Sequence, residues 1–188
     1  MLSFYVHIPY CIKRCGYCDF NTYTPSELQD GATLEIVSND YIDAVLRELD
    51  AAPTDVVPTI FFGGGTPSLL PAHDLGRVIA AIKARNGLTA DCEITLEANP
   101  DSVTAEKLAE YLHVGFNRIS FGMQSAKPHV LAALDRTHNP ANVEKAITMA
   151  RAASFQSISV DLIYGTPGES LQDWQDTVDA ALSLDIDH

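Results

Sequence analysis

Three of the four cysteines in the sequence lie close together, at Cys11, Cys15 and Cys18. Thiolates with this C-x3-C-x2-C spacing can converge on one inorganic centre if the backbone wraps around it. An iron–sulfur cubane has four iron corners and usually takes four cysteines, so three cysteines leave one iron without a protein ligand. In metal sites, such an open position is where a substrate binds. The spacing therefore predicts a [4Fe–4S] cluster with one open coordination position.

A structural zinc site is the alternative interpretation of the same cysteines, with His7 or Cys92 as the fourth ligand. Zinc sites usually have paired C-x2-C spacings, and the sequence has no second pair. We expect Cys92 to begin a strand and to be a small buried apolar residue. The cluster is the favoured interpretation because the cysteines follow the first predicted strand of a βα series.

Polar or glycine-rich residues occur where the predicted β-strands end. Strands are expected at residues 4–7, 59–62, 93–98, 118–122 and 157–163. The residues at or after their ends are Cys11, the turn 63–66, residues 97–100, Gln124 and Asp161. Because parallel strands of a barrel form the active site at their carboxyl ends, these residues are expected to meet. Glycines in the turn would let the backbone approach a ligand closely.

Segments with helical periodicity separate these strands, within residues 41–49, 108–112, 143–150 and 171–182. Thr104 is a predicted N-cap, Gly115 lies where the helix before it should end, and Ser170 begins a predicted capping box. The apolar side chains of the last helix are expected on one stripe, at Leu171, Trp174, Val178 and Leu182. The irregular stretch 19–37 is predicted to be a functional loop.

Strand and helix alternate about five times, which indicates an α/β fold with parallel βαβ units. A doubly wound sheet and a partial (β/α) barrel both fit this order. We favour the partial barrel of about five βα units, because the polar residues recur at the strand ends. Residues 1–188 would form one domain, whose sequence stops where a sixth strand is expected. We therefore interpret it as a truncated piece of a longer barrel protein.

The composition is that of a globular protein, with 46% hydrophobic and 20% charged residues. The net charge of −13 disfavours binding to nucleic acid or to anionic membranes. The N-terminus lacks the basic and apolar regions of a signal peptide, and no apolar stretch has membrane-spanning length. Clustered cysteines suit metal binding in a reducing compartment, so we expect a cytoplasmic protein.

Several motifs resemble those of the radical S-adenosylmethionine (SAM) family of oxygen-independent coproporphyrinogen III oxidases and their relatives. They are residues 5–11 (YVHIPYC), the cysteine loop, 61–67 (FFGGGTP), 95–100 (TLEANP), 119–124 (ISFGMQ), 135–138 (DRTH) and 160–167 (VDLIYGTP). The resemblance covers nearly the whole chain and implies a radical SAM barrel in which SAM ligates the open iron of the cluster. Electron transfer from the cluster then cleaves SAM and yields a 5′-deoxyadenosyl radical.

The resemblance also implies which residues contact SAM: Tyr5, Tyr17, Gly64, Gly65, Thr66, Glu97, Gln124, Arg136 and Asp161. Gly64–Thr66 would receive the methionyl amine, and Arg136 the carboxylate. Other interpretations remain open for some of these residues. Glu97 could form a salt bridge with Arg118 or Arg136, Arg136 could be a solvated surface charge, and Tyr5 could be a core aromatic. His7 and His138 could serve substrate or cluster, or be structural.

One position separates two branches of the resembled family. The oxidases usually carry a fourth cysteine two residues after the third, and here that position is Phe20. This departure is typical of the related heme chaperones of the HemW type, which would bind heme and pass it to a recipient protein. The oxidase alternative would act on a porphyrinogen, and an electron donor such as a flavodoxin or ferredoxin is expected in either case. A third hypothesis is a cluster-free barrel fragment that binds a nucleotide.

Overall fold

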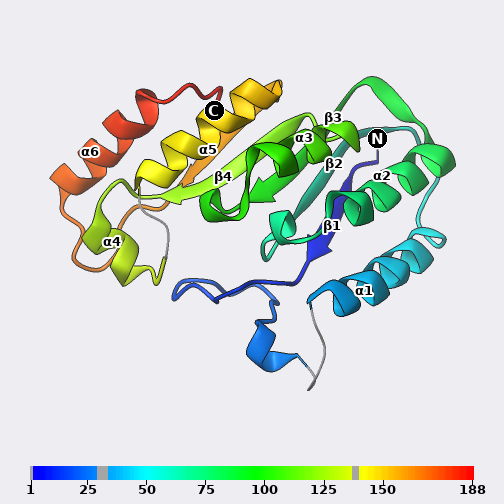
Figure 1. Ribbon diagram of the computed structural model, residues 1–188, viewed down its shortest axis with the longest axis horizontal. Coiled ribbons are helices and arrows are strands. Elements are labelled where there is room, and N and C mark those ends of the chain that lie inside the picture. The colour runs from blue at the N-terminus through cyan, green and yellow to red at the C-terminus, as the bar shows by residue number, and fades with distance from the viewer. Residues whose placement is uncertain (1, 29–33, 137–139) are drawn as a thin grey trace.

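The computed structural model describes residues 2–28, 34–136 and 140–188, so His138 lies outside the described residues. Its centre is one sheet of parallel strands in the order β1-β2-β3-β4-β5 (Figure 1). The strands are β1 (Phe4–Ile8), β2 (Val57–Gly64), β3 (Leu88–Ala98), β4 (Arg118–Gln124) and β5 (Ser157–Leu162). Each strand pairs in parallel with the next one along the chain.

The helices form a layer against this sheet (Figure 1). They are α1 (Leu34–Leu49), α2 (Ala72–Asn86), α3 (Ala105–His113), α4 (Pro128–Ala133), α5 (Pro140–Ala153) and α6 (Leu171–Leu182). α1 packs on α2, α2 on α3, and α3 on α5. A doubly wound sheet reverses its strand order at a switch point, whereas this order runs in one direction. The predicted partial barrel is therefore confirmed.

The two faces of the sheet differ because apolar and polar residues alternate along the strands. One face is buried against the helices and includes Ile8, Phe62, Leu96, Phe121 and Ile158. The opposite face, which we call the polar face, carries Thr59, Glu93, Thr95, Glu97, Arg118, Ser120, Ser159 and Asp161. This alternation points the polar side chains away from the face that is buried against the helices.

The predicted helix boundaries agree with the structure in three places. Thr104 accepts a hydrogen bond from the Lys107 amide at the start of α3. Gly115 follows the end of that helix with φ of +116°, a conformation that favours glycine. Ser170 and Asp173 form the expected capping box at the start of α6.

Other boundaries differ from the prediction. α1 begins at Leu34, so the irregular stretch after the cysteines is shorter than 19–37. β3 begins at Leu88, so Cys92 lies inside this strand and does not begin it. The apolar stripe of α6 is also not its buried side, since Leu171 and Leu182 are 84% and 78% exposed. Thr177 and Ala181 are buried instead, because the Thr177 hydroxyl bonds to Ser125 and Ala126 beyond β4.

The last residues of the chain lie beside β5, where a sixth strand was expected. The Val160 amide donates to the His188 carbonyl at 3.1 Å, and the Asp187 amide to the Ile158 carbonyl at 2.8 Å. These bonds partly cover the edge of the sheet, which would otherwise present unpaired backbone groups. Among the residues that the structure describes, no helix is both long enough and apolar enough to cross a membrane.

Candidate functional site

A cavity of about 670 Å³ opens at the carboxyl ends of the strands. Its volume is in the range of small-molecule sites. It brings together the cysteine loop, the glycine-rich turn after β2 and the ends of β3, β4 and β5. The predicted site residues that line it are Cys11, Cys15, Tyr17, Cys18, Gly64, Gly65, Thr66, Glu97, Gln124, Arg136 and Asp161.

Tyr5 is the predicted site residue that is not part of this lining. Its ring is 56% exposed, so it is not the core aromatic of the alternative interpretation. It stacks on Phe61 with ring centroids 6.0 Å apart, and its hydroxyl lies 3.4 Å from Nδ1 of His7. Tyr5 therefore lies beside Phe61 on one face of the sheet, outside the cavity lining.

The cysteine loop is held at both ends by backbone hydrogen bonds. The Cys11 amide donates to the Tyr23 carbonyl at 3.0 Å, and the Tyr23 amide donates back to Pro9 at 2.6 Å. On the far side, the Gly16 amide donates to the Leu134 carbonyl at 3.2 Å. These bonds connect the loop to β1 and to the end of α4.

An arginine inside the loop adds side-chain anchors. Arg14 donates to the backbone carbonyl and the hydroxyl of Thr22, and forms an ion pair with Glu27 at 3.0 Å. Glu27 also accepts from the Thr24 amide at 2.8 Å. The loop can therefore keep its shape without a ligand, which pre-organises the three thiols.

Hydrogen-bond donors approach two of the three sulfur atoms. The Thr66 hydroxyl lies 3.7 Å from Sγ of Cys11, and the Arg136 guanidinium lies 3.4 Å from Sγ of Cys15. Burial raises the pKa of the Cys11 thiol, and the bond from Thr66 opposes that rise. Burial likewise raises the pKa of Tyr17 to about 12, against the nearby charge of Arg136. The Thr66 hydroxyl and the Arg136 guanidinium are therefore placed to donate hydrogen bonds to sulfur atoms of the loop.

The two residues considered as a fourth zinc ligand lie elsewhere. Nε2 of His7 lies 2.9 Å from the Asn21 carbonyl, and its other ring nitrogen faces Tyr5. Cys92 is buried within β3, and its thiol points at the Glu93 carbonyl. Within residues 2–28, 34–136 and 140–188, no three His, Cys, Asp or Glu residues are grouped so that they could hold a metal ion. The three loop cysteines line the cavity without meeting at one point.

Each of the three glycines at the end of β2 and just after it leaves room for a different neighbour. A Cβ on Gly63 would lie 2.8 Å from the Glu97 carboxylate, and one on Gly64 2.4 Å from the His7 ring. A Cβ on Gly65 would meet the Tyr10 carbonyl at 2.6 Å. The sequence suggested that these glycines serve a ligand, but the structure shows that they first allow β1 and β3 to approach the turn.

Two carboxylates line the cavity, Glu97 on β3 and Asp161 on β5, with β4 between them. Glu97 accepts a hydrogen bond from the Gly64 amide at 3.1 Å. The salt bridge considered between Glu97 and Arg118 is wrong, since Arg118 pairs with Glu93 at 3.4 Å. Burial raises the pKa of Glu97 to about 7, and the charge of Asp161 adds to that rise. Burial also raises the pKa of Asp161, with a hydrogen bond from Ser120 opposing it.

Gln124 and Arg136 converge over Gly122. The pairing of β4 with β5 shifts register between Gly122 and Gln124, and Gln124 has φ of +62°. Such an irregularity re-aims a side chain at the end of a strand. Arg136 donates to the Gly122 carbonyl at 2.9 Å, so it is not a solvated surface charge. A Cβ on Gly122 would lie 2.7 Å from the Gln124 amide nitrogen and 3.1 Å from the Arg136 guanidinium.

Other residues of the cavity were not predicted to be part of it. Ile12 and Phe20 present exposed apolar side chains at its rim, and Ser120 lies in its wall. Asp135 has φ of +56°, and its carboxylate pairs with Lys13 at 3.3 Å. The signal for Ser120 was present in the sequence, since serine alternates with large apolar residues along β4. The role of Asp135 depends on the contact between two distant loops, which no local pattern reveals.

Replacing Glu97 with glutamine should stabilise the cluster-free protein at high pH. Glu97 has a pKa of about 7 in the folded chain and an ordinary value near 4.5, so its ionisation costs folding free energy as pH rises through 7. We expect Glu97→Gln to have little effect on the free energy of unfolding at pH 5 and to increase it by about 3 kcal/mol at pH 8.5. Urea denaturation at the two pH values measures the difference.

Glu27→Gln provides a control of opposite sign. The Thr24 amide lowers the pKa of Glu27, so its ionised form stabilises the fold above the ordinary pKa of glutamate. This variant should lose stability at pH 8.5 and not at acid pH. A Glu97→Gln effect that is the same at pH 5 and pH 8.5 would contradict the assigned burial of this carboxylate.

Comparison with protein families gives one match that covers the site. Residues 5–181 match the model of the Radical SAM superfamily. In fold, the chain is similar to the coproporphyrinogen III oxidase HemN from Escherichia coli, described as a radical SAM enzyme. The TM-score is 0.83 at 28% identity, over 98% of this chain and 42% of that one.

Curated relatives are closer in sequence than this solved structure. The heme chaperone HemW of Mycobacterium tuberculosis (strain ATCC 25618 / H37Rv) is 46% identical over 189 residues, which are 98% of this chain and 47% of that protein. HemW of Escherichia coli (strain K12) is 38% identical over 191 residues, covering 100% of this chain and 49% of that protein. The chain therefore spans about half the length of the curated relatives it matches.

Proposed function

Because the chain belongs to the radical SAM superfamily, we propose that it forms the cluster- and SAM-binding part of a heme chaperone. Such a protein binds heme and transfers it to recipient proteins. The observation that carries the proposal is that three cysteines of one loop and the polar strand ends line a single cavity. The 46% identity to a heme chaperone supports this branch of the superfamily.

The residues present fit a [4Fe–4S] cluster. Cys11, Cys15 and Cys18 would be its ligands, in a loop anchored on both sides. Thr66 and Arg136 would donate hydrogen bonds to the ligating sulfurs, contacts that tune such clusters. When bound, the cluster offers one iron to SAM and serves as its electron source. Because metal binds thiolates and not thiols, the raised pKa of Cys11 predicts that assembly releases a proton.

The same cavity has the groups that SAM needs, and we assign them as follows. Arg136 would bind the methionyl carboxylate, and the turn Gly64–Thr66 its amine, through backbone carbonyls. Glu97 would face the amine or the ribose, and Gln124 and Asp161 would bond the ribose hydroxyls. The remaining two residues are aromatic: Tyr17 would lie beside the adenine, and Tyr5 would contact the cofactor from the open side of the sheet.

The choice between chaperone and oxidase depends on one loop residue and on the relatives. Phe20 occupies the position where the resembled oxidases usually have a fourth cysteine, and its side chain is 62% exposed at the rim of the cavity. The oxidase reaction, which removes carbon dioxide from propionates to leave vinyl groups, is the second candidate. The similarity in fold to HemN favours it. We further propose a cytoplasmic location, an electron donor such as a flavodoxin or ferredoxin, and a heme-recipient protein.

An anaerobic assay on the whole gene product that contains this sequence tests the proposal. The reconstituted protein is titrated with heme and followed by its Soret absorbance, then mixed with an apo-hemoprotein as the acceptor. In parallel, it is incubated with coproporphyrinogen III, SAM and a reductant, and the porphyrins are separated by chromatography. We expect stoichiometric heme binding, transfer to the acceptor, and no vinyl products. Repeated turnover to vinyl products would establish the oxidase, and failure to bind heme would refute the chaperone.

A further inference from the structure

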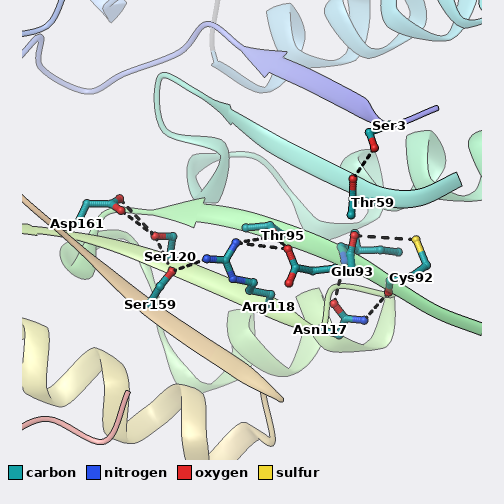
Figure 2. A network of polar contacts seen from close by, with 11 residues as sticks. Ser3, Thr59, Cys92, Glu93, Thr95, Asn117, Arg118, Ser120, Ser159 and Asp161 are labelled. Atoms are coloured by element: carbon teal, nitrogen blue, oxygen red, sulfur yellow. Dashed lines mark hydrogen bonds and ion pairs between the residues drawn. The ribbon is translucent and has the colours of Figure 1, made fainter. Parts of the chain in front are cut away.

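A chain of hydrogen bonds crosses the polar face and ends on Asp161 (Figure 2). The Arg118 guanidinium donates to the Ser159 hydroxyl at 3.2 Å. The Ser159 hydroxyl donates to the Ser120 hydroxyl at 2.9 Å. The Ser120 hydroxyl then faces both carboxylate oxygens of Asp161, at 3.2 and 3.3 Å. The chain thus connects the middle of the sheet with the wall of the cavity.

The chemistry of its two ends determines the direction of this chain. A guanidinium can only donate hydrogen bonds, and an ionised carboxylate can only accept them. The hydroxyls of Ser159 and Ser120 must therefore each accept on the side of Arg118 and donate on the side of Asp161. Bonds aligned in this way polarise one another and stabilise negative charge at the accepting end.

Burying these hydroxyls costs folding free energy unless each of them forms hydrogen bonds. Ser120 and Ser159 are 5% and 2% exposed, and they pair side by side in adjacent strands. An apolar residue at either position would pack without needing a partner. At its start, Arg118 is held by Glu93 and by the hydroxyl of Thr95, each at 3.4 Å. The hydrogen-bond chain therefore begins at an arginine that is held in place and ends at Asp161.

We propose that Arg118, Ser159 and Ser120 are positioning residues that hold the Asp161 carboxylate as an oriented hydrogen-bond acceptor in the wall of the cavity. The acceptor would receive the ribose hydroxyls of SAM, so this part of the inference rests on the proposed function. The three residues would act through Asp161, and of the three Ser120 is the one that lies in the cavity wall.

The charges around Asp161 agree with this role. Glu97 faces it from β3, Arg118 from β4, and His188 from the C-terminal segment. Burial raises the pKa of Asp161, whereas the Ser120 hydrogen bond, Arg118 and His188 oppose that rise. The charge on Asp161 in turn raises the pKa of Glu97. The chain would thus keep Asp161 ionised while Glu97 holds its proton to higher pH, which gives the two carboxylates different roles.

Carboxyl NMR of the cluster-free protein, with ¹³C-labelled aspartate, tests the chain without any cofactor. Asp161→Asn assigns the Asp161 resonance. We expect the pKa of Asp161 to rise in Ser120→Ala, and to rise less in Ser159→Ala and Arg118→Met. Once Ser120 is alanine, adding Ser159→Ala should have no further effect, because the path is already broken. Ser120→Thr, which keeps the hydroxyl, should restore the original value.

The matched control is Ser157→Ala, which makes the same serine-to-alanine change on β5, the strand that carries Ser159 and Asp161. Ser157 pairs in register with Arg118 of β4. It lies four residues from Asp161, or about 13 Å along a strand, and should leave the pKa of Asp161 unchanged. Arg118→Met provides a second route to the answer if a serine variant fails to fold, because its side chain is 20% exposed.

SAM binding by the reconstituted protein then tests the positioning role. At pH 6.5, Ser120→Ala should raise the Kd for SAM about tenfold, the effect of losing about one hydrogen bond to a charged group. The loss should shrink at pH values above the pKa that NMR gives for Asp161 in this variant, because the carboxylate is then ionised without the hydrogen bond. An unchanged pKa of Asp161 in the variants would overturn the proposal. A shifted pKa with unchanged SAM affinity would refute the positioning role, and wild-type protein that binds no SAM would refute the proposed function alone.

Discussion

Replacing Cys11 with alanine is expected to abolish the iron–sulfur cluster while the chain still folds. Removing one of three ligands leaves two irons without protein contacts, and the remaining thiolates cannot hold a cubane. The fold should survive because the loop is anchored by the backbone bonds of Cys11 and Gly16 and by Arg14, none of which needs the thiol. After anaerobic reconstitution, the variant should be colourless, with essentially no bound iron or sulfide.

The fourth cysteine supplies the matched control. Cys92 is buried in β3 and is not part of the cavity lining. Cys92→Ala should therefore keep the brown colour, the iron content and the electron paramagnetic resonance of the reduced cluster. Its cost would be a small loss of stability, about 1 kcal/mol from the lost packing. A Cys11→Ala protein with wild-type iron content, or a colourless Cys92→Ala protein, would show that the ligand set is wrong.

Replacing Gly65 with alanine should have the second-largest effect, and here the fold itself is affected. A Cβ at this position would lie 2.6 Å from the Tyr10 carbonyl, 2.8 Å from the Ile8 carbonyl and 2.9 Å from the Tyr10 amide. These are backbone atoms at the end of β1, and the Gly65 amide donates to that same Ile8 carbonyl at 2.7 Å. The added methyl group must push the turn and β1 apart, which we expect to cost about 3 kcal/mol.

The displacement would also reach the cluster site, because Tyr10 directly precedes Cys11 and the adjacent Thr66 hydroxyl faces the Cys11 sulfur. We therefore expect Gly65→Ala to unfold at a lower denaturant concentration and to bind less iron after reconstitution.

Gly122→Ala distinguishes the effect of a displaced backbone from the effect of displaced side chains. Its Cβ would meet only the ends of the Gln124 and Arg136 side chains, which can move. This variant should fold and keep its cluster, but bind SAM about tenfold more weakly because its predicted contacts are displaced. Equal stability of Gly65→Ala and wild type would contradict the close approach of the turn to β1.

The sequence alone was sufficient for the order of the elements and for most of the candidate site. Alternating apolar and polar residues identify strands, and glycine, threonine and serine mark helix ends, because these preferences are local. Cys11, Glu97 and Asp161 lie at or after the carboxyl ends of predicted strands. Any parallel sheet therefore places them at the same edge. Nearness in space follows from topology here, so no tertiary detail was needed.

Details that depend on register or on contacts between distant loops could not be predicted. The shift in pairing that re-aims Gln124 depends on how β4 meets β5. The buried side of α6 was also mistaken, because the hydroxyl of Thr177 has partners beyond β4 that its periodicity does not show.

By itself, the sequence determined the ligand chemistry, through three cysteines at short spacing, and the end of the sheet at which that chemistry occurs. Tertiary structure decided which buried polar groups bond to one another, including the chain from Arg118 to Asp161 and the close approach of Gly65 to β1. The physical reason is the separation along the sequence over which each interaction acts. Propensity and alternation act over a few neighbouring residues, whereas a hydrogen bond between adjacent strands requires a match in register that only the folded sheet fixes.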